Sequence, residues 1–302
     1  MTRTDNDTWD LASSVGVTAT MVAAGRARAT RAGLIDDRFA EPLVTAVGVD
    51  FFTRWATGEI AAGDVDVPGQ PWGMQPMTDL LAVRTRHIDE FVAAAAATGI
   101  TQTVILASGL DARGYRLSWP ATATVFEIDQ PQVLDFKQSV LAGLNAQPTV
   151  DLRFVPIDLR DDWPTALRAA GFDPNRPTAW IAEGLLAFLP PDAQDRLLDA
   201  VTALSAERSR LLAEVFLTSP DSDQVHQQAE QRWREQGLDV ELGELTYQGP
   251  RSDVATHLTG NGWQVERVLL RELLADSGFP VPTAGDGTVA DNYYCTAVRT
   301  AR

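Results

Sequence analysis

The segment VILASGLDARGYRL, residues 104–117, has the pattern of a strand that turns into a helix. An apolar run leads into a serine and a glycine, and a helix-like segment follows. Gly109 permits a backbone with positive φ, or a close approach between the backbone and a ligand. Many α/β proteins hold a nucleotide at such a turn, although a tight turn without a ligand has the same pattern. The segment therefore predicts a strand–turn–helix unit whose ligand has to be found from its surroundings.

The rest of the chain predicts a parallel sheet around this unit. Short apolar segments rich in strand-forming residues alternate with helix-like segments of roughly ten residues or more, which is the spacing of βαβ units. The expected strands are TVILAS (103–108), ATVFEID (123–129), DLRFVPID (151–158), TAWIAEGLL (178–186), RLLAEVFL (210–217), WQVERVLL (263–270) and NYYCTAV (292–298). This order favours a doubly wound, mostly parallel seven-stranded α/β sheet, with a ligand at the carboxyl ends of its strands.

The segments outside the sheet are predicted to be mainly helical. Residues 13–60 and 77–97 have helical spacing, and a proline- and glycine-rich loop, residues 63–73, separates them. We therefore expect an amino-terminal helical cap over residues 1–85 and a sheet domain over residues 86–302. A polar segment, residues 221–262, predicts a helical insertion at about 220–260, before the last two strands.

Composition excludes several classes of protein. The chain has 302 residues, 45% of them hydrophobic, and a formal net charge of −16. A nucleic-acid-binding protein needs a basic surface, and an anionic membrane would repel this charge. The single cysteine, Cys295, lies in an expected strand and predicts a buried thiol. Neither a signal peptide nor an apolar run long enough to span a membrane is visible, so we expect a cytoplasmic protein without a membrane span.

Acidic residues end three consecutive expected strands. Asp129 ends the second strand and lies twenty residues after Gly109, Asp158 ends the third and is followed by Leu159, and Glu183 ends the fourth. A carboxylate in the first of these positions can accept hydrogen bonds from both ribose hydroxyls. Asp158 can accept from an adenine amino group while Leu159 covers the ring. Each acid alone could instead cap a helix, and this alternative is strong for Asp158, which precedes RDDW.

These acids also indicate the class of ligand. Together with Asp111 they place several negative charges around one crevice, which disfavours a pyrophosphate. The glycine turn is a poor phosphate cradle too, because it lacks both the third glycine of a dinucleotide site and the Gly-Lys-Ser/Thr step of a P-loop. A ligand with a ribose, an adenine, an ammonium and a sulfonium fits better, and S-adenosylmethionine has all four. Its carboxylate needs a cation, for which Arg84, on the helix before the first strand, is a candidate.

The chain also resembles a known family. WDLASSVGVTATMVAAGRA (9–27), LLAVRTRHID (80–89), VILASGLDARGYRL (104–117), VFEIDQPQV (125–133), PIDLRDDWP (156–164) and WIAEGLLAFLP (180–190) occur in this order. They are similar to the mycobacterial family of S-adenosylmethionine-dependent methyltransferases, which is related to leucine carboxyl methyltransferases and to some polyketide O-methyltransferases. The resemblance implies the Rossmann-like fold of class I methyltransferases, with S-adenosylmethionine as the cofactor.

The resemblance also implies roles for individual residues. Asp129 would hold the ribose, Asp158 and Leu159 the adenine, and Glu183 would lie near the methionine moiety or the methyl group. Gly109 would lie near the methionine amine. Arg84 would bind the methionine carboxylate. A second arginine would assist it, either Arg26 or Arg28, which are close together in the sequence. One departure is that Leu106, Ala107 and Ser108 stand where many methyltransferases have an acid and a second glycine.

The acceptor is less determined by the sequence. We expect transfer of a methyl group to a carboxylate or hydroxyl of a small or lipid- or polyketide-like molecule, with a protein carboxyl terminus as the competing acceptor. A hydroxyl needs a base, for which His87, His226, His257 and Tyr247 are candidates, and none is assigned. No metal site is indicated, and the oligomeric state is open. Aromatic and aliphatic residues suggest an acceptor pocket between the amino-terminal helices and the insertion: Phe51, Phe52, Trp55, Phe216, Leu217 and Trp233. The alternatives are an NAD(P)-dependent oxidoreductase and an inactive protein that only binds the cofactor.

Overall fold

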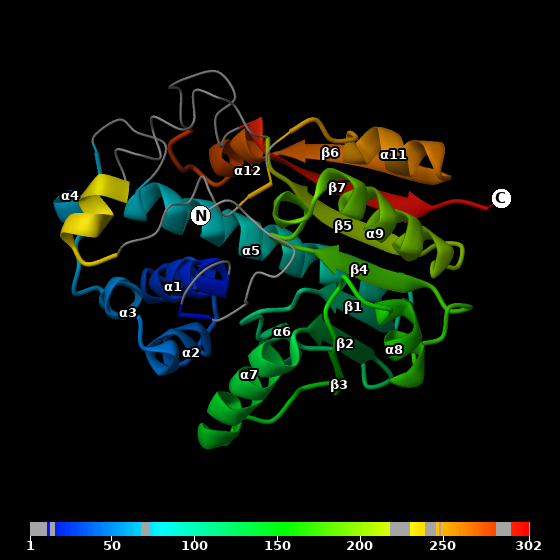
Figure 1. Cartoon of the computed structure of the whole chain (residues 1–302), viewed down its shortest axis with the longest axis horizontal. Coiled ribbons are helices and arrows are strands. Elements are labelled where there is room, and N and C mark those ends of the chain that lie inside the picture. Colours follow the sequence, from blue (N-terminus) through cyan, green and yellow to red (C-terminus); the bar gives the residue numbers. More distant parts are fainter. Residues whose placement is uncertain are drawn as a thin grey trace.

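The core of the computed structural model is a seven-stranded sheet (Figure 1). The structure describes residues 11–12, 16–67, 73–217, 230–238, 246–247, 249–281 and 291–301. The strands lie in the order β3-β2-β1-β4-β5-β7-β6. Their bounds are β1 Gln102–Leu106, β2 Thr124–Asp129, β3 Asp151–Pro156, β4 Thr178–Ala182, β5 Arg210–Val215, β6 Trp263–Leu269 and β7 Tyr293–Arg299. β7 is antiparallel to both of its neighbours, and the other strand pairs are parallel.

Helices precede the sheet and connect its strands. The amino-terminal helices are α1 (Gly16–Arg31), α2 (Ala40–Val47), α3 (Asp50–Thr57), α4 (Ala62–Val65) and α5 (Met74–Ala97). The connections contain α6 (Arg113–Arg116), α7 (Pro131–Gly143), α8 (Trp163–Ala169), a 3₁₀ turn (Leu186–Phe188) and α9 (Pro191–Ala203). α11 (Val254–Gly260) precedes β6, and α12 (Leu270–Asp276) follows it. No helix in these parts of the chain combines the length and apolar character needed to cross a membrane.

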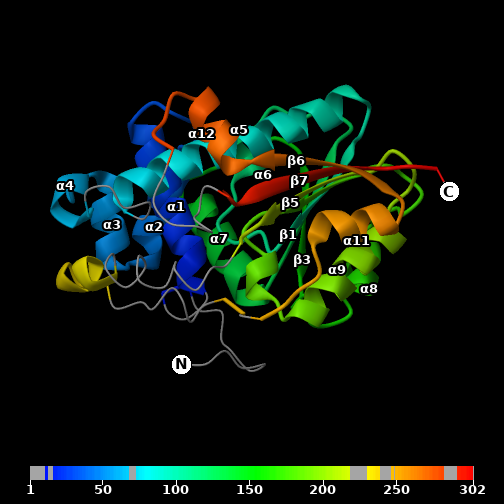
Figure 2. The same cartoon turned by 90° about the horizontal axis from the view of Figure 1, so that it is seen from above.

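Both faces of the sheet are buried, which explains the continuous apolar strands. Ile105 belongs to the core shared with α1–α3, α5, α7 and α12, whereas its neighbour Val104 belongs to the core shared with α8, α9 and α11. Successive side chains of a strand point to opposite faces, so a central strand such as β1 serves both cores. Figure 2 shows α5 and α12 on one side of the sheet and α8, α9 and α11 on the other. The amino-terminal helices thus extend one of the two cores.

The predicted sheet is confirmed, with differences in the helices. All seven expected strands are present, and the described part of the helical segment 13–60 forms α1, α2 and α3; the backbone turns between α2 and α3 at Gly48, with φ of 82°. α12 was not predicted, since its residues follow β6 without a break. The suggested boundary at residue 85 falls inside α5, which packs on α1 and on β5, so the cap and the sheet share this helix.

The predicted insertion is described only in part. Residues 230–235 are helical, whereas residues 218–229, 239–245 and 248 lie outside the described residues, His226 among them. Trp233 packs against Phe51, with 6.1 Å between ring centroids, and Arg54 Nη2 donates to the carbonyl of Gln236 at 2.6 Å. The insertion therefore contacts the amino-terminal helices, as the suggested acceptor pocket requires. Phe51, Phe52, Trp55 and Trp233 are themselves at most 2% exposed, so they form core, while Leu217 is exposed.

Candidate cofactor site

The glycine turn lies at the point where the strand order reverses. β1 has β2 on one side and β4 on the other, and ligands of doubly wound sheets bind in the crevice at such a switch point. Gly109 follows β1 with φ of +49°, and its backbone N–H donates to Asp129 Oδ2 at 2.6 Å. A Cβ on Gly109 would lie 3.3 Å from Cβ of Ala19, on α1. Gly109 thus has the positive φ that the sequence allowed, and the structure adds a close approach to α1.

Asp129 ends β2 and faces this turn. Its Oδ2 accepts from Gly109, and its Oδ1 accepts from the backbone N–H of Gln130 at 2.7 Å. Burial raises the pKa of Asp129, and these two hydrogen bonds oppose that rise. Each carboxylate oxygen can accept a second hydrogen bond, so the side chain keeps acceptor capacity for two hydroxyls. The ribose role of Asp129 stays a prediction, and the structure adds that Asp129 also orders the turn.

Asp158 lies just beyond the end of β3. It does not cap the following helix, because α8 begins at Trp163 and its cap is Asp162, which accepts from the N–H of Thr165 at 3.2 Å. Asp158 accepts instead from the backbone N–H of Arg160 at 2.8 Å, from the guanidinium of Arg160 and from the side-chain amide of Gln130. Burial alone would raise the pKa of Asp158, but the hydrogen bonds from Arg160 outweigh it and lower that pKa.

The adenine assignment can be tested with two variants of this segment. Asp158→Asn removes the charge that assists a hydrogen bond from the adenine amino group, and Leu159→Ala removes apolar contact of about 1–3 kcal/mol. We expect both variants to weaken binding of S-adenosylhomocysteine and of free adenosine alike, with little change in the melting temperature of the free protein. Calorimetry and thermal denaturation measure the two effects. Lower stability with unchanged adenosine affinity would place the adenine elsewhere.

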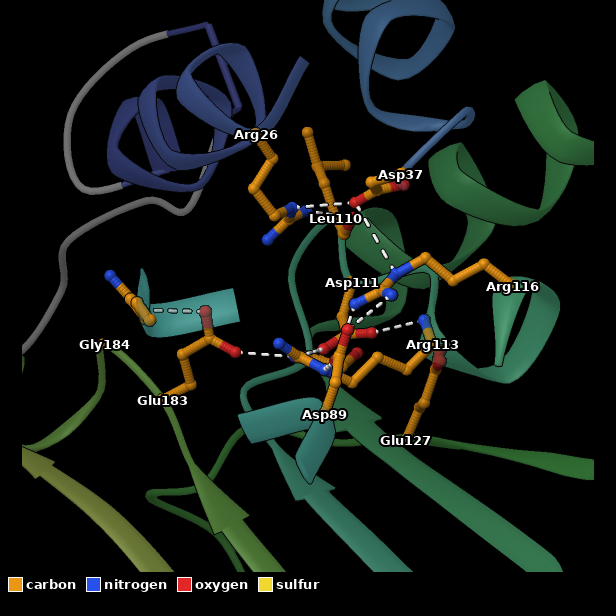
Figure 3. A network of polar contacts seen from close by, with 12 residues as sticks. Arg26, Asp37, Asp89, Leu110, Asp111, Arg113, Arg116, Glu127, Glu183 and Gly184 are labelled. Atoms are coloured by element: carbon orange, nitrogen blue, oxygen red, sulfur yellow. Dashed lines mark hydrogen bonds and ion pairs between the residues drawn. The ribbon is translucent and has the colours of Figure 1, made fainter. Parts of the chain in front are cut away.

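Glu183, directly after β4, lies between two buried arginines. Its Oε1 is 2.9 Å from Arg84 Nε, and its Oε2 accepts from Arg113 Nη1 at 2.7 Å. Burial opposes ionisation here, but the charges of Arg113 and Arg84 outweigh it and lower the pKa of Glu183 to about 2. Arg113 also pairs with Asp111 and with Asp89 of α5, as Figure 3 shows. Glu183 is therefore a fixed negative charge at the switch point, suited to an ammonium group.

Arg84, the candidate for the cofactor carboxylate, is already engaged. Besides Glu183 it pairs with Glu214 of β5, whose Oε2 is 3.0 Å from Arg84 Nη2 and also accepts from the N–H of Gly184 at 2.8 Å. Burial raises the pKa of Glu214, against the charge of Arg84. Arg84 is only 4% exposed, and two carboxylates share its charge. Its role at the cofactor carboxylate stays a prediction, and the contacts show that it also positions Glu183.

Arg26, on α1, is a second cation beside this network. Its Nε donates to Asp37 Oδ2 at 2.9 Å and its Nη2 donates to the carbonyl of Leu110 at 2.7 Å, as Figure 3 shows. Its Nη1 has no hydrogen bond to the described residues, and the charge of Arg26 lowers the pKa of Glu183. Arg28 points elsewhere, because its Nη1 lies 2.2 Å from the position of a Cβ on Gly58, after α3. Of these two arginines, Arg26 is the one beside the crevice.

The balance of charge in the crevice differs from the expectation. The acids were expected to repel a pyrophosphate, but buried Arg84 and Arg113 pair with Glu183 and Asp111. Asp158 pairs with Arg160, which leaves Asp129 as the acid without an arginine partner. Arg116 Nη1 pairs with Asp89 at 2.7 Å. The argument against a dinucleotide thus rests on the glycine turn more than on charge. Glu183 keeps lone pairs that an ammonium could use, and Arg26 Nη1 could donate to a carboxylate, so these residues are compatible with S-adenosylmethionine and their roles at it stay predictions.

Several groups of this site were missed in the sequence. They are Arg113, Glu214, Asp89, Asp37 and Lys137. The available signal was an ionisable residue inside an apolar strand, which applies to Glu214 in RLLAEV and to Glu127 in VFEID, since such a residue has to be paired when buried. Among the described residues, no group of three or more histidines, cysteines or acids could hold a metal ion.

A seven-stranded sheet with an antiparallel β7 between β5 and β6 has the topology of the Rossmann-like methyltransferase fold. The model of the leucine carboxyl methyltransferase family matches residues 19–202. The chain belongs to this family and is an S-adenosylmethionine-dependent methyltransferase, in agreement with the resemblance seen in its motifs.

Relatives agree with this assignment, and a solved structure has the same fold. A protein from Mycolicibacterium paratuberculosis, named "Putative S-adenosyl-L-methionine-dependent methyltransferase", is 64% identical over 299 residues, which cover 99% of this chain and 98% of the relative. A protein of the same name from Mycobacterium tuberculosis is 58% identical, with 97% and 98% covered. A DUF574 family protein from Streptomyces avermitilis shares the fold with a TM-score of 0.51 at 16% identity, covering 86% of this chain and 96% of its own.

Proposed function

We propose that the enzyme methylates an oxygen atom, and that its acceptor is a carboxylate on a small or lipid- or polyketide-like molecule. The observation that supports this most is the match to the leucine carboxyl methyltransferase family, whose name specifies a carboxyl acceptor. A carboxylate is nucleophilic at neutral pH, so its methylation needs no base. The proposal thus also agrees with a site in which the acids that surround the crevice are already paired.

In the proposed reaction the residues of the chain bind and orient. Bound S-adenosylmethionine supplies a methyl group on a sulfonium, which is a good leaving group. Asp129 and Asp158 hold the nucleoside, while Glu183 and Arg26 hold the two charged groups of the methionine part. The acceptor oxygen forms the new C–O bond as the C–S bond breaks. The electron pair of the C–S bond stays on sulfur. A carboxylate acceptor gives a methyl ester and S-adenosylhomocysteine without release of a proton. Positioning of this kind supplies much of the rate.

One observation favours a hydroxyl acceptor instead. His87, on α5 and three residues after Arg84, has a buried Nε2 without a hydrogen-bond partner, and its ring lies 5.0 Å from that of Tyr294. Burial lowers the pKa of His87, so the ring is neutral at neutral pH and able to accept a proton. His257, another of the candidate bases, differs from His87 in that its Nε2 contacts Asp199 Oδ1 at 2.8 Å. Burial raises the pKa of Tyr294, which disfavours this tyrosine as a base.

The two acceptors predict different behaviour of His87→Gln. With a carboxylate acceptor we expect the variant to keep kcat within about threefold of wild type, and both proteins to have a flat rate between pH 6 and 8. With a hydroxyl acceptor that uses His87, kcat should fall by about 100-fold or more, since a general base contributes about 10²–10⁴-fold. The measurement is kcat of both proteins with tritiated S-adenosylmethionine and a panel of acids and matched alcohols. The products are identified by mass.

The same panel tests the remaining alternatives. Methyl transfer only to peptides with a free carboxyl terminus would make a protein carboxyl terminus the acceptor. Methylation of alcohols but of no acid would contradict the carboxylate proposal. Binding of S-adenosylhomocysteine without turnover of any acceptor would favour a protein that only binds the cofactor.

A further inference from the structure

The only lysine in the chain lies buried beneath the cofactor crevice. Lys137 is on α7, and its side chain is fully buried. Taking an ammonium out of water is unfavourable unless the group is paired and hydrogen-bonded. The other basic residues of the chain, apart from histidines, are arginines, which have longer and forked side chains. The position of Lys137 therefore calls for a physical reason.

Lys137 joins the two segments that face the nucleoside. Its Nζ is 2.6 Å from Oε2 of Glu127, on β2, and donates to the hydroxyl of Ser108 at 3.2 Å. Glu127 is two residues before Asp129 on the same strand, so both carboxylates point to the same face of the sheet. Ser108 directly precedes Gly109 in the turn. One ammonium group thus ties the glycine turn to the strand that ends in Asp129.

This contact replaces the features that the turn lacks. Ala107 has φ of +50°, a left-handed backbone that glycine adopts more readily, and no acid precedes the turn. The backbone N–H of Ser108 donates to the carbonyl of Ile128 at 3.0 Å, and its hydroxyl accepts from Lys137. The turn is therefore held from β2 and α7, where many methyltransferases use an acid and a second glycine.

The charge of Lys137 also acts on its acidic neighbours. Burial raises the pKa of Glu127 to about 7, while Lys137 opposes this rise and Asp111 and Asp129 add to it. Burial raises the pKa of Asp129 as well; Lys137 again opposes the rise, and Asp158 adds to it. Lys137 is therefore the cation beside Glu127 and Asp129, whereas their acidic neighbours Asp111 and Asp158 pair with Arg113 and Arg160.

We propose that Lys137 is a positioning residue for the cofactor, which holds the Ser108–Gly109 turn against β2 and keeps positive charge beneath the carboxylate that accepts the ribose. The inference rests on the proposed ribose role of Asp129. Lys137 itself does not touch the cofactor, since Ser108 and Glu127 take its hydrogen bonds. Its effect reaches the ribose through the shape of the turn and through the ionisation of Asp129.

The test compares two variants that differ in whether the ammonium is present. The double variant Lys137→Met with Glu127→Gln removes both partners of the ion pair, so it leaves no unpaired buried charge. Because the pKa of Glu127 is about 7, this side chain carries little charge at pH 6, and the loss of Lys137 dominates there: Asp129 loses its cationic neighbour and becomes protonated at higher pH. Glu127→Gln alone keeps the ammonium, so Asp129 keeps its cationic neighbour. Ser108→Ala is the matched control, which removes the hydroxyl and leaves the charges.

Calorimetric affinity for S-adenosylhomocysteine between pH 6 and 8 is the readout. We expect the double variant to bind about tenfold more weakly at pH 6, because a charge-assisted hydrogen bond is replaced by a neutral one. The loss should shrink toward pH 8. In Glu127→Gln the affinity at pH 6 should equal or exceed that of wild type, and Ser108→Ala should weaken binding by the same small factor at every pH.

Two results would overturn the inference. One is wild-type affinity of the folded double variant across this pH range. The other, which applies even when the double variant does not fold, is that Glu127→Gln weakens binding more at pH 6 than at pH 8. Failure of the ribose assignment of Asp129 can be told apart from failure of the inference about Lys137. In that case Asp129→Ala would leave the affinity for S-adenosylhomocysteine unchanged, whatever the Lys137 variants do.

Discussion

Replacement of Asp129 by alanine is expected to weaken binding of S-adenosylhomocysteine by about 100-fold or more. Each hydrogen bond to a charged acceptor contributes about 1.5–3 kcal/mol, and the carboxylate is assigned two ribose hydroxyls. A loss of about 3 kcal/mol corresponds to roughly two orders of magnitude in the dissociation constant. Free adenosine should lose a similar factor, because it carries the same ribose. Calorimetry with both ligands measures the two losses.

The structure adds a second effect to this variant. Asp129 also accepts from the backbone N–H groups of Gly109 and Gln130, which alanine leaves without an acceptor. We therefore expect a lower melting temperature of the free protein, and titrations have to be made well below it. Gln132→Ala, at an exposed position of the helix that follows Asp129, keeps these backbone groups and the contacts of Asp158, and is the control for a local disturbance. Unchanged affinity in folded Asp129→Ala protein would contradict the ribose assignment.

The second large effect is expected for Glu183→Gln at the methionine end. This variant should bind S-adenosylhomocysteine about 10–100-fold more weakly, since an ammonium loses a charged acceptor worth about 1.5–3 kcal/mol. Adenosine, which has no ammonium, should bind as it does to the wild type. Arg84 keeps Glu214 as a partner, and Arg113 keeps Asp111 and Asp89. A parallel loss for adenosine would mean that the variant disturbs the whole crevice rather than one contact.

The pH dependence of this contact follows from the arginines. Because the pKa of Glu183 in the folded protein is about 2, below the ordinary value of 4.5, its ionised form adds stability at and above that ordinary value. This contribution is lost only as the pH falls from about 4.5 toward 2. Glu183 should therefore cause no change in affinity between pH 5 and 8, and any change in that range has to come from another group.

The sheet was predictable because its signals are local. Each strand is a short apolar segment bounded by turn residues, and the pattern from Val104 to Tyr294 fixes seven of them. The placement of Asp129, Asp158 and Glu183 at neighbouring strand ends was also predictable, because an acid at a strand end is visible in the sequence and parallel strands bring such ends together; their roles at the cofactor stay predictions. α12 was missed, since Leu270 continues the apolar pattern of β6.

The ion pairs of the site were not predictable in this way. Arg84 and Glu214 are paired although 130 positions separate them, and Arg113 joins α5 to β4 through Asp89 and Glu183. Their partners are set by the packing of α5 on the sheet, which no local pattern encodes. The same holds for Lys137, whose helix has ordinary spacing and gives no sign that its ammonium lies under the glycine turn.

The central claim, that this crevice is an S-adenosylmethionine site, is tested most directly by calorimetric titration of the wild-type protein with S-adenosylhomocysteine and with NAD side by side. The account predicts binding of S-adenosylhomocysteine with one molecule per chain and no measurable heat with NAD. The physical reason is a glycine turn that cannot cradle a pyrophosphate, beside strand-end carboxylates that we assign to the ribose and to the ammonium. Binding of NAD that is as tight as that of S-adenosylhomocysteine would contradict it.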